Sequence, residues 1–265
     1  MRPDQQADPD LRDRLREAAV KFQSGLTLVE VLVAMAILGI ILVLITNWQM
    51  QTLQLTTKTN AGAEQLVELN DLSGYIGDRV RSASSVRRTG LTVNAASAVN
   101  AGKCDTTTPC LAVLALEEKV DTSSTPPTIT RKWMRLVFRM EPRATWSGAD
   151  KVPDDWADDA SNKVMILREY RDICTITTVP AQTCEAFKAS FLDAAFSGMS
   201  PALVTDSLTS VDQSGATILP FDFTATSATV TLKFQSKRNV RGVTTFSPGA
   251  APYTLDVQAR NVPYP

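Results

Sequence analysis

The sequence predicts an α+β fold, in which a long N-terminal hydrophobic α-helix packs on a mainly antiparallel β-sheet head. Three observations lead to this prediction. From Leu26 to Thr57 the chain carries a single charge, on Glu30. From Leu66 to Ala83, apolar or small residues recur at steps of three and four, which is the period of one helix face. Further along, apolar and polar residues alternate in short runs, as in half-buried strands.

The composition already excludes several functions. The 265 residues include 27 basic and 28 acidic side chains, so the net charge of -1 gives no global attraction to nucleic acid or to an anionic membrane. The chain contains no histidine. Ser-His and Cys-His catalysis and the usual catalytic zinc sites are therefore excluded. We expect no enzymatic activity and no cofactor.

The segment Val31–Ile45 consists only of apolar residues and glycine. Three apolar residues lengthen it upstream and Trp48 lies at its downstream end, so it approaches the roughly 20 residues that a membrane-spanning helix needs. A cleaved secretory signal peptide is disfavoured, because residues 46–49 offer no small-x-small cleavage site. A plain signal anchor stays open, with Glu30 near the positive end of the helix dipole.

The run Lys21-Phe22-Gln23-Ser24-Gly25, followed by Leu26-Thr27-Leu28-Val29-Glu30 and the apolar segment, resembles the class III signal of type IV prepilins. This resemblance implies that a prepilin peptidase cuts between Gly25 and Leu26, and that Leu26 is then N-methylated. It also implies that Glu30 sets the subunit register by pairing with the N-terminal amine of a neighbour. A carboxylate at that depth costs up to about 2.5–3.5 kcal/mol, and we expect no intramolecular side-chain partner for it.

The sequence departs from that family in several respects. Leu26 stands where phenylalanine is usual, the leader is long and acid-rich, and Asn47 stands where many major pilins carry a proline. These departures argue against a major pilin. The stretches Leu69–Ala83 and Leu255–Asn261 resemble parts of minor pilins and J-type pseudopilins. The resemblance implies three parts: a cytoplasmic leader (1–25), a long helix with its N-terminal half in the membrane (26–85) and a β-rich head (86–265).

The long helix is expected from Leu26 to Ala83, because no proline interrupts the chain there. Its second half has a predicted inner face made of Leu66, Leu69, Ser73, Ile76, Val80 and Ala83. Charged residues, Glu68 among them, are expected to face solvent on the other sides. We expect local fraying at Thr56–Ala63, where Thr and Gly weaken the helical pattern. A coiled-coil partner is the alternative occupant of the inner face.

The head is expected to contain at least six strands. They lie at Leu111–Leu116, Trp133–Met140, Val164–Tyr170, Thr175–Val179, Thr229–Phe234 and Tyr253–Arg260. Alternation places Met134, Leu136, Phe138 and Met140 on one face of their strand, and Val230, Leu232 and Phe234 inward on theirs. A short helix is expected at Glu185–Phe196, with Phe187, Phe191, Ala194 and Ala195 on one side. Long exposed loops are expected at Val120–Thr130 and Thr145–Ser161.

The four cysteines fall into two closely spaced pairs. Cys104 and Cys110 flank a Thr/Pro turn, and Cys174 and Cys184 flank Val179-Pro180. Local pairing is the simplest of the three connectivities, and an even number of cysteines in an external head fits an oxidising compartment. A zinc site built from all four is the rival, although the spacings exceed those usual for zinc. Redox catalysis is disfavoured because no C-x-x-C motif exists.

Two charged clusters are candidate ligand sites. The first lies within residues 150–159, and its candidate calcium ligands are Asp154, Asp155, Asp158 and Asp159. Their spacing fits no EF-hand-like loop, so a solvated acidic loop is the preferred interpretation. The second cluster could contact DNA phosphate, and it consists of Lys233, Lys237, Arg238 and Arg241. An ordinary exposed β-turn is the simpler explanation of this second cluster.

These observations and the resemblance predict a minor pilin-like subunit of a type IV pilus or a related pseudopilus, which acts by assembly. The expected partners are other pilin subunits, prepilin peptidase and the membrane, through residues 26–50. The precursor is expected in the inner (cytoplasmic) membrane, and the processed subunit in a pilus or pseudopilus with its head outside the cytoplasm. Two alternatives stay open: an unprocessed, membrane-anchored extracytoplasmic enzyme or binding domain, and a DNA-uptake pilin.

Overall fold

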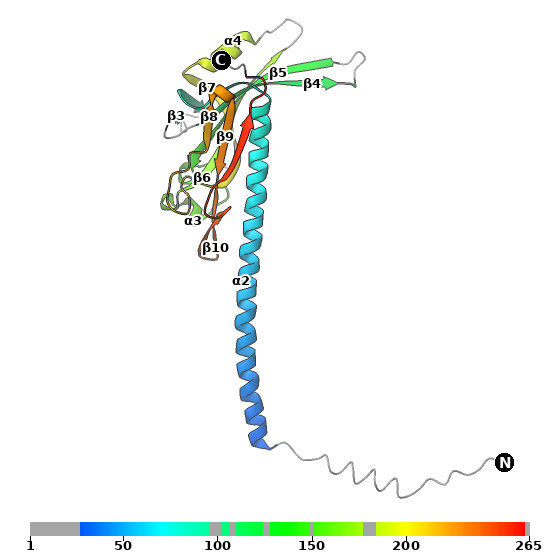
Figure 1. Cartoon of the computed structure of the whole chain (residues 1–265), viewed down its shortest axis with the longest axis vertical. Coiled ribbons are helices and arrows are strands. Elements are labelled where there is room, and N and C mark those ends of the chain that lie inside the picture. The colour runs from blue at the N-terminus through cyan, green and yellow to red at the C-terminus, as the bar shows by residue number, and fades with distance from the viewer. Residues whose placement is uncertain are drawn as a thin grey trace, which may run out of the picture. The chain divides into compact units, whose positions relative to one another are not determined.

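The computed structural model describes residues 27–95, 102–106, 110–123, 128–148, 151–176 and 184–262. The chain forms two compact units, residues 1–56 and residues 57–265. One long helix, two β-sheets and several short helices make up the described part (Figure 1). The long helix followed by a mainly antiparallel sheet confirms the predicted α+β class.

Helix α2 extends from Leu28 to Arg81 over 54 residues without a break. It ends two residues before the expected Ala83, which instead begins strand β1. The expected fraying at Thr56–Ala63 is wrong. The backbone stays helical there. The Thr56 hydroxyl donates to the Thr52 carbonyl at 2.9 Å, a bond that is compatible with the helix.

One face of the later part of α2 is buried in the head. Its buried residues are Gln65, Leu69, Leu72, Ser73, Ile76, Gly77 and Val80. This stripe confirms most of the predicted inner face. The prediction was wrong at Leu66, which is 45% exposed, because the stripe passes through Gln65, one position and about 100° away around the helix. Glu68 was also misplaced, since it faces the sheet rather than solvent.

The larger sheet has nine strands. Seven lie in the order β1-β4-β5-β6-β7-β10-β11, and β2 and β3 extend it beside β7. The bounds are β1 Ala83–Arg87, β2 Leu91–Ala95, β3 Gly102–Cys104, β4 Leu111–Asp121, β5 Thr128–Pro142, β6 Val164–Ile176, β7 Ala195–Thr209, β10 Ser236–Val240 and β11 Val243–Ser247. The pairing is antiparallel except between β2 and β7.

The smaller sheet has the order β12-β9-β8. Its strands are β8 Phe221–Thr224, β9 Thr229–Phe234 and β12 Tyr253–Gln258. Strand β9 has the predicted bounds, and Val230, Leu232 and Phe234 are buried as predicted. The alternation identified this strand because only one of its faces is buried.

Two hydrophobic clusters lie on opposite faces of the larger sheet. The first joins α2, through residues such as Ile76, to Leu136 of β5 and Leu232 of the smaller sheet. The second includes Val137 of β5 and Tyr170 of β6. Leu136 and Val137 are neighbours in sequence and both are fully buried. Strand β5 is therefore covered on both faces, whereas the alternation in its sequence predicted only one.

The region predicted as a helix at Glu185–Phe196 contains three elements. Helix α4 covers Glu185–Ala189, the 3-10 helix η4 covers Ser190–Leu192, and β7 begins at Ala195. The single-helix prediction was wrong: Phe191 and Phe196 are both buried in the second cluster, with ring centroids 5.9 Å apart, but they lie in different elements, η4 and β7. Ala194 and Ala195 are exposed instead of lining an inner helix face.

Both predicted long loops contain regular structure. In the first, β4 continues to Asp121 and β5 starts at Thr128, so five of the eleven residues of Val120–Thr130 lie in paired strands. In the second, helix α3 (Asp155–Asp158) follows the 3-10 helix η2 (Arg143–Thr145) and precedes η3 (Ala160–Asn162). Trp146 and Ala157 are buried there. The strand expected at Thr175–Val179 is the end of β6, and residues 177–183 lie outside the described part.

Candidate functional site

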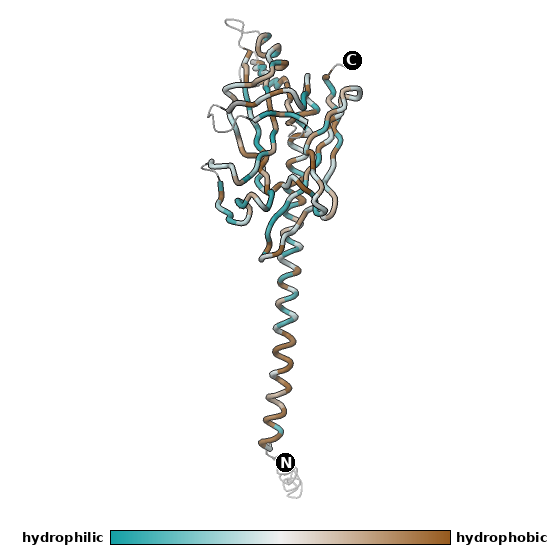
Figure 2. Tube along the Cα trace, turned by 90° about the vertical axis from the view of Figure 1, so that its left-hand side faces the viewer, coloured by the Kyte–Doolittle hydropathy of each residue, from teal (hydrophilic) through white to brown (hydrophobic). Residues whose placement is uncertain are grey.

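The first half of α2 is the candidate site for membrane insertion and assembly. Every side chain from Thr27 to Thr56 is exposed, including large apolar ones such as Ile40 (63%) and Trp48 (71%). Figure 2 shows this part of the helix as a nearly continuous hydrophobic run. In the described part of the chain, α2 alone is long and apolar enough to span a membrane. An apolar surface of this extent needs lipid or other helices around it.

The hydroxyl groups in this half are bonded within the helix. Thr46 donates to the Leu42 carbonyl at 2.7 Å, and Thr52 donates to the Trp48 carbonyl at 2.9 Å. In hydrocarbon an unpaired hydroxyl would cost several kcal/mol, on the order of 2–7. Because each threonine finds its acceptor four residues earlier, the helix presents no unpaired threonine hydroxyl at these positions to an apolar environment.

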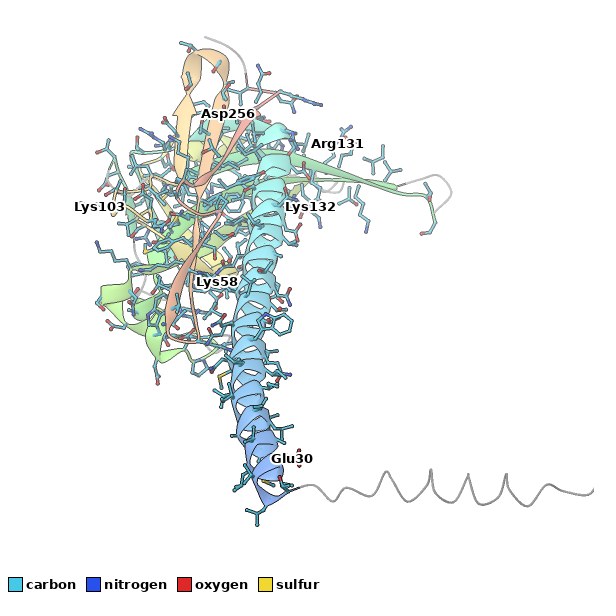
Figure 3. The ribbon with its side chains drawn as sticks, turned by 60° about the horizontal axis from the view of Figure 1, so that its bottom comes forward. Glu30, Lys58, Lys103, Arg131, Lys132 and Asp256 are labelled. Carbon is cyan, nitrogen blue, oxygen red and sulfur yellow. A yellow bond between two sulfur atoms is a disulfide. The ribbon has the colours of Figure 1, made fainter. Side chains whose placement is uncertain are left out.

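Glu30 lies at the N-terminal end of α2 (Figure 3) and is bonded to Thr27. The Thr27 amide donates to Glu30 Oε2 at 2.9 Å, the Thr27 hydroxyl donates to the same oxygen at 3.1 Å, and the Glu30 amide donates to the Thr27 hydroxyl at 3.2 Å. This is a capping box, in which the first and fourth residues satisfy each other's free amides. The expectation that Glu30 has no intramolecular side-chain partner was therefore wrong.

Gly25 and Leu26 lie outside the described residues, as does the rest of the leader. Helix α2 starts at Leu28, the third residue after the expected cut. Cleavage and methylation at Gly25 and Leu26 stay predictions.

All four cysteines of the head are bonded in disulfides with local pairing. Cys104 bonds Cys110, with Cα atoms 5.2 Å apart, and Cys174 bonds Cys184, with Cα atoms 6.0 Å apart. Cys104 and Cys110 are buried in the second cluster. With every sulfur in a disulfide, none is a thiolate that could hold zinc or perform thiol chemistry.

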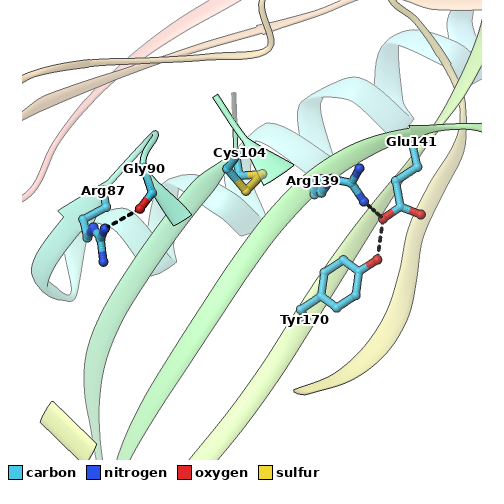
Figure 4. The surroundings of a disulfide bond; sticks show 7 residues. Arg87, Gly90, Cys104, Arg139, Glu141 and Tyr170 are labelled. Carbon is cyan, nitrogen blue, oxygen red and sulfur yellow. Dashed lines mark hydrogen bonds and ion pairs between the residues drawn. A yellow bond between two sulfur atoms is a disulfide. The ribbon is translucent and has the colours of Figure 1, made fainter. Parts of the chain in front are cut away.

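A buried polar network beside Cys104 was not found from the sequence (Figure 4). Arg139 donates to Glu141 Oε1 at 2.6 Å, and the Tyr170 hydroxyl donates to the same oxygen. Burial, with Glu141 adding to it, raises the pKa of Tyr170 from its usual 10.0 to about 12. This network ties β5 to β6, and Glu141 and Tyr170 are buried, so we assign it a structural role. Glu141 directly follows the strand predicted at Trp133–Met140, and no pattern in the sequence indicated that this carboxylate is buried.

Three of the four candidate calcium ligands cap short helices or form ion pairs within their own segment of the head. Asp154 caps α3 by accepting from Trp156 and Ala157, and Asp159 caps η3. Asp158 pairs with Arg143 and Lys151, each at 3.0 Å. Burial opposes ionisation of Asp158, but hydrogen bonds from Lys151 and the Asp154 amide, together with the charges of Lys151 and Arg143, outweigh it and lower the pKa of this carboxyl. Asp155 is exposed. Within the described ranges, no group of three or more acidic or cysteine side chains is arranged to hold a metal ion.

The four basic candidates do not form one surface. Lys237 donates to the Asn162 carbonyl at 2.6 Å and lies over the ring of Trp156. Burial, followed by repulsion from Lys163, lowers its pKa. Arg238, the next residue, faces α2 and pairs with Glu68. Lys233 lies in the other sheet, on β9, and Arg241 lies in the β10–β11 turn.

Residues 20–46 match the profile of a family described as the prokaryotic N-terminal methylation motif. The match includes the expected cleavage residues, Glu30 and the whole apolar segment. No curated protein and no solved structure gives a match. The chain therefore carries a type IV pilin-like prepilin signal, at the end of the one helix in the described part that could span a membrane.

Proposed function

We propose that this protein is a minor pilin-like structural subunit of a type IV pilus or a related pseudopilus. The proposal rests on where the methylation motif lies in the structure. The methylation motif at 20–46 overlaps the half of α2 in which every described side chain is exposed. The motif indicates a type IV pilin-like subunit with a structural, non-enzymatic role. It implies processing by prepilin peptidase and assembly with other pilins.

The proposed order of events follows from that overlap. The precursor is held in the inner membrane by residues 26–50, with residues 1–25 as a cytoplasmic leader and residues 86–265 as an extracytoplasmic head. Peptidase removes the leader after Gly25, and Leu26 becomes a methylated N-terminus. Glu30 then pairs with the N-terminal amine of a neighbour. Thr27 gives the carboxylate two hydrogen bonds before assembly, which lowers the cost of holding it in the membrane.

The minor subgroup is proposed from the sequence departures at Leu26 and Asn47 and from the loose resemblance of Leu69–Ala83 and Leu255–Asn261. The alternatives are less well supported. For the enzyme alternative, the described head offers no group of three or more acidic or cysteine side chains arranged to hold a metal ion. The basic residues expected to contact DNA are divided between two sheets, and Lys237 and Arg238 already have partners.

The N-terminus of the mature chain tests the proposal. Mass spectrometry of the protein from cells with an active prepilin peptidase should show the loss of 25 residues and an N-methylated Leu26. An intact chain beginning at Met1 in those cells would contradict it and would favour the unprocessed anchor.

The role of Glu30 is tested separately. Glu30→Val should be inserted and cleaved normally, yet its incorporation into filaments should fall about tenfold or more, because the registering ion pair is lost. Thr46→Val is the matched control. It also removes a polar group from the exposed apolar half, but the Thr46 hydroxyl is bonded to the Leu42 carbonyl of its own helix. Equal incorporation of the two variants would remove the register role from Glu30.

A further inference from the structure

The hairpin of β10 and β11 ends in a two-residue turn whose conformation is well defined. Val240 and Val243 are the last residues that pair across the two strands. Arg241 and Gly242, which join them, both have positive φ, 53° and 81°, as in the tight turn that suits the twist of a hairpin. The Gly242 amide also donates to Oδ1 of Asn239 at 2.7 Å. The turn therefore holds Arg241 at the very end of the hairpin.

The base of this hairpin is attached to α2, within the compact unit of residues 57–265. Ser236 pairs with Ser247, whose hydroxyl donates to the Gly62 carbonyl at 3.4 Å. From that base the strands run four steps, or about 13 Å, to their last pair. Figure 1 shows the hairpin as the part of the head that reaches furthest towards the N-terminal end of α2. Lys58 precedes Gly62 by one helical turn, so it lies on the face of α2 to which the hairpin is attached.

Lys58 and the end of the hairpin together form what we call the tip surface, which consists of Lys58, Val240, Arg241 and Val243. Lys58 and Arg241 are exposed, and neither has a partner among the described residues. Val243 is 55% exposed. The surrounding segments, residues 57–63 and 236–247, contain no acid. The tip surface therefore combines unpaired cations with an exposed apolar side chain.

The acidic side chains of the neighbouring elements lie away from the tip surface. Those of α3 lie near the base of the hairpin, where Lys237 is placed over the ring of Trp156. Arg241 is four residues further along, or about 13 Å, which exceeds the screening length of about 8 Å at physiological ionic strength. Glu64 is the next acid along α2, and it lies about 120° around the helix from Lys58. The two cations thus have no acid beside them to neutralise their charge.

We propose that the tip surface contacts anionic headgroups of the membrane in which α2 is anchored. This inference rests on the proposed function, which places residues 26–50 in that membrane. Lys58 follows residue 50 by eight positions, or about 12 Å along a helix, and the headgroup layer adds about 5–8 Å to each side of the hydrocarbon core. Side chains on a helix lean towards its N-terminus, so the Lys58 ammonium points back towards the headgroups.

Charge and position together select lipid as the partner. Lys58 is the first charged residue after Glu30, so the chain changes from apolar to cationic where the membrane-spanning segment ends, as interfacial anchors do. Arg241 and Val243 bring a second cation and an apolar side chain to this end of the head from a different element. Each cation near an anionic lipid surface strengthens binding about fivefold. The head is then held at two points, α2 and the hairpin, which fixes the side that it turns to the membrane.

A fluorescent probe at Val243 tests the contact in the full chain, reconstituted in lipid vesicles. The four native cysteines are in disulfides, so Val243→Cys introduces a single free thiol for an environment-sensitive dye. The emission should rise and shift to the blue in an equal mixture of phosphatidylcholine and phosphatidylglycerol, compared with phosphatidylcholine alone, and brominated lipid should quench it. Val120→Cys is the matched control, because Val120 is a similarly exposed valine (52%) on β4, which pairs with the strand that follows the other end of α2.

Charge reversal supplies the second measurement. Arg241→Asp, a residue that tolerates the positive φ of this position, should lower the response of the Val243 probe about fivefold, and adding Lys58→Glu should abolish it. Salt at about 1 M should also abolish the response of the chain with both cations, because it shortens the screening length to about 3 Å. The matched control is Lys119→Glu, which reverses an exposed cation on β4 and should leave the response unchanged.

Three outcomes would overturn the contact: equal emission in the two lipid mixtures, an unchanged response in the double charge reversal, or a response that follows the density of protein in the vesicles instead of the phosphatidylglycerol content. The last outcome would assign the tip surface to a neighbouring chain. Flotation of the same samples separates this inference from the function on which it rests. A chain that floats with the vesicles but gives no response at Val243 loses the contact and keeps its membrane anchor. A chain that does not float loses both.

Discussion

The two halves of α2 obtain their stability from different surroundings. From Thr27 to Thr56 every side chain is exposed, and the hydroxyl groups of Thr46, Thr52 and Thr56 are bonded within the helix. From Gln65 to Val80 one stripe is buried in the head. Tyr75 and Glu68, which flank this stripe, bond across to strand residues, Tyr75 to Glu169 of β6 and Glu68 to Ser207 of β7. One unbroken helix therefore contains an interface for lipid or other subunits and an interface for its own head.

This difference predicts which measurement each half should affect. A change in the exposed half removes no intrachain packing, so it should alter assembly and leave the stability of the head unchanged. A change in the buried stripe should lower the free energy of unfolding of the head. Matched substitutions, one in the exposed half of α2 and one in the packed part of the chain, test whether the two differ in this way.

The largest effect is expected from Ile76→Ala, set against Ile37→Ala. Ile76 is fully buried in the cluster shared by α2 and both sheets, whereas Ile37 is 53% exposed. Losing the buried side chain leaves a cavity and should lower the free energy of unfolding by about 2–5 kcal/mol. Ile37→Ala should change it by less than about 0.5 kcal/mol. Chemical denaturation of the detergent-solubilised chain, followed by near-UV circular dichroism, measures both. Equal losses would mean that the halves are not energetically distinct.

The sequence predicted the side-chain orientation in full only for a strand with one buried face. Strand β9 alternates cleanly because Val230, Leu232 and Phe234 face the core and their neighbours do not. Strand β5 is buried on both faces, so the alternation in its sequence predicted the face that contains Leu136 and missed the face that contains Val137. Short strands such as β10, with the sequence SKRNV, have no alternation to detect. Their place in the sheet depends on tertiary pairing with β7 and β11.

The candidate site was easier to predict than the head, because its chemistry is local. Glu30 stands out as one charge in an apolar run. Its bonds to Thr27 were missed, although Thr-x-x-Glu before an apolar run is itself a readable helix-start pattern. The partners of Glu68 and Lys237 could not be read in this way. Glu68 meets Arg238 across 170 positions of sequence, and only the folded head brings them together.

A smaller contrast is expected between a glycine of the head and a glycine in the exposed half of α2. A Cβ atom on Gly102 of β3 would lie 1.8 Å from the guanidinium carbon of Arg139, whereas a Cβ on Gly39 of α2 would meet nothing within 4 Å. Gly102→Ala should displace Arg139 from its ion pair with buried Glu141 and cost about 1–3 kcal/mol. Gly39→Ala should raise helix stability by up to about 1 kcal/mol. Thermal denaturation of the two variants gives the comparison.

A double variant checks the cause. In an Arg139→Ala background there is no guanidinium to displace, so adding Gly102→Ala should cost less than about 0.5 kcal/mol. A full cost in that background would show that the strain lies in the backbone of β3, not in the Arg139–Glu141 pair.

The smallest effect concerns the start of α2, where the exposed half has its one intrachain side-chain network. Thr27→Val removes the hydroxyl that caps the helix and should weaken its first turn by about 1 kcal/mol, while Thr27→Ser keeps the hydroxyl and should change little. Hydrogen exchange of the amides in residues 28–31, measured in detergent micelles, should be about fivefold faster in Thr27→Val. The denaturation midpoint of the head should be the same in both variants, because no head residue contacts this turn among those described. If the exchange rate in Thr27→Val were unchanged, the hydrogen bond from the Thr27 amide to Glu30 would be sufficient to cap the helix without the hydroxyl. The Glu30 carboxylate would then be held by a bond within its own chain before it meets a neighbouring subunit.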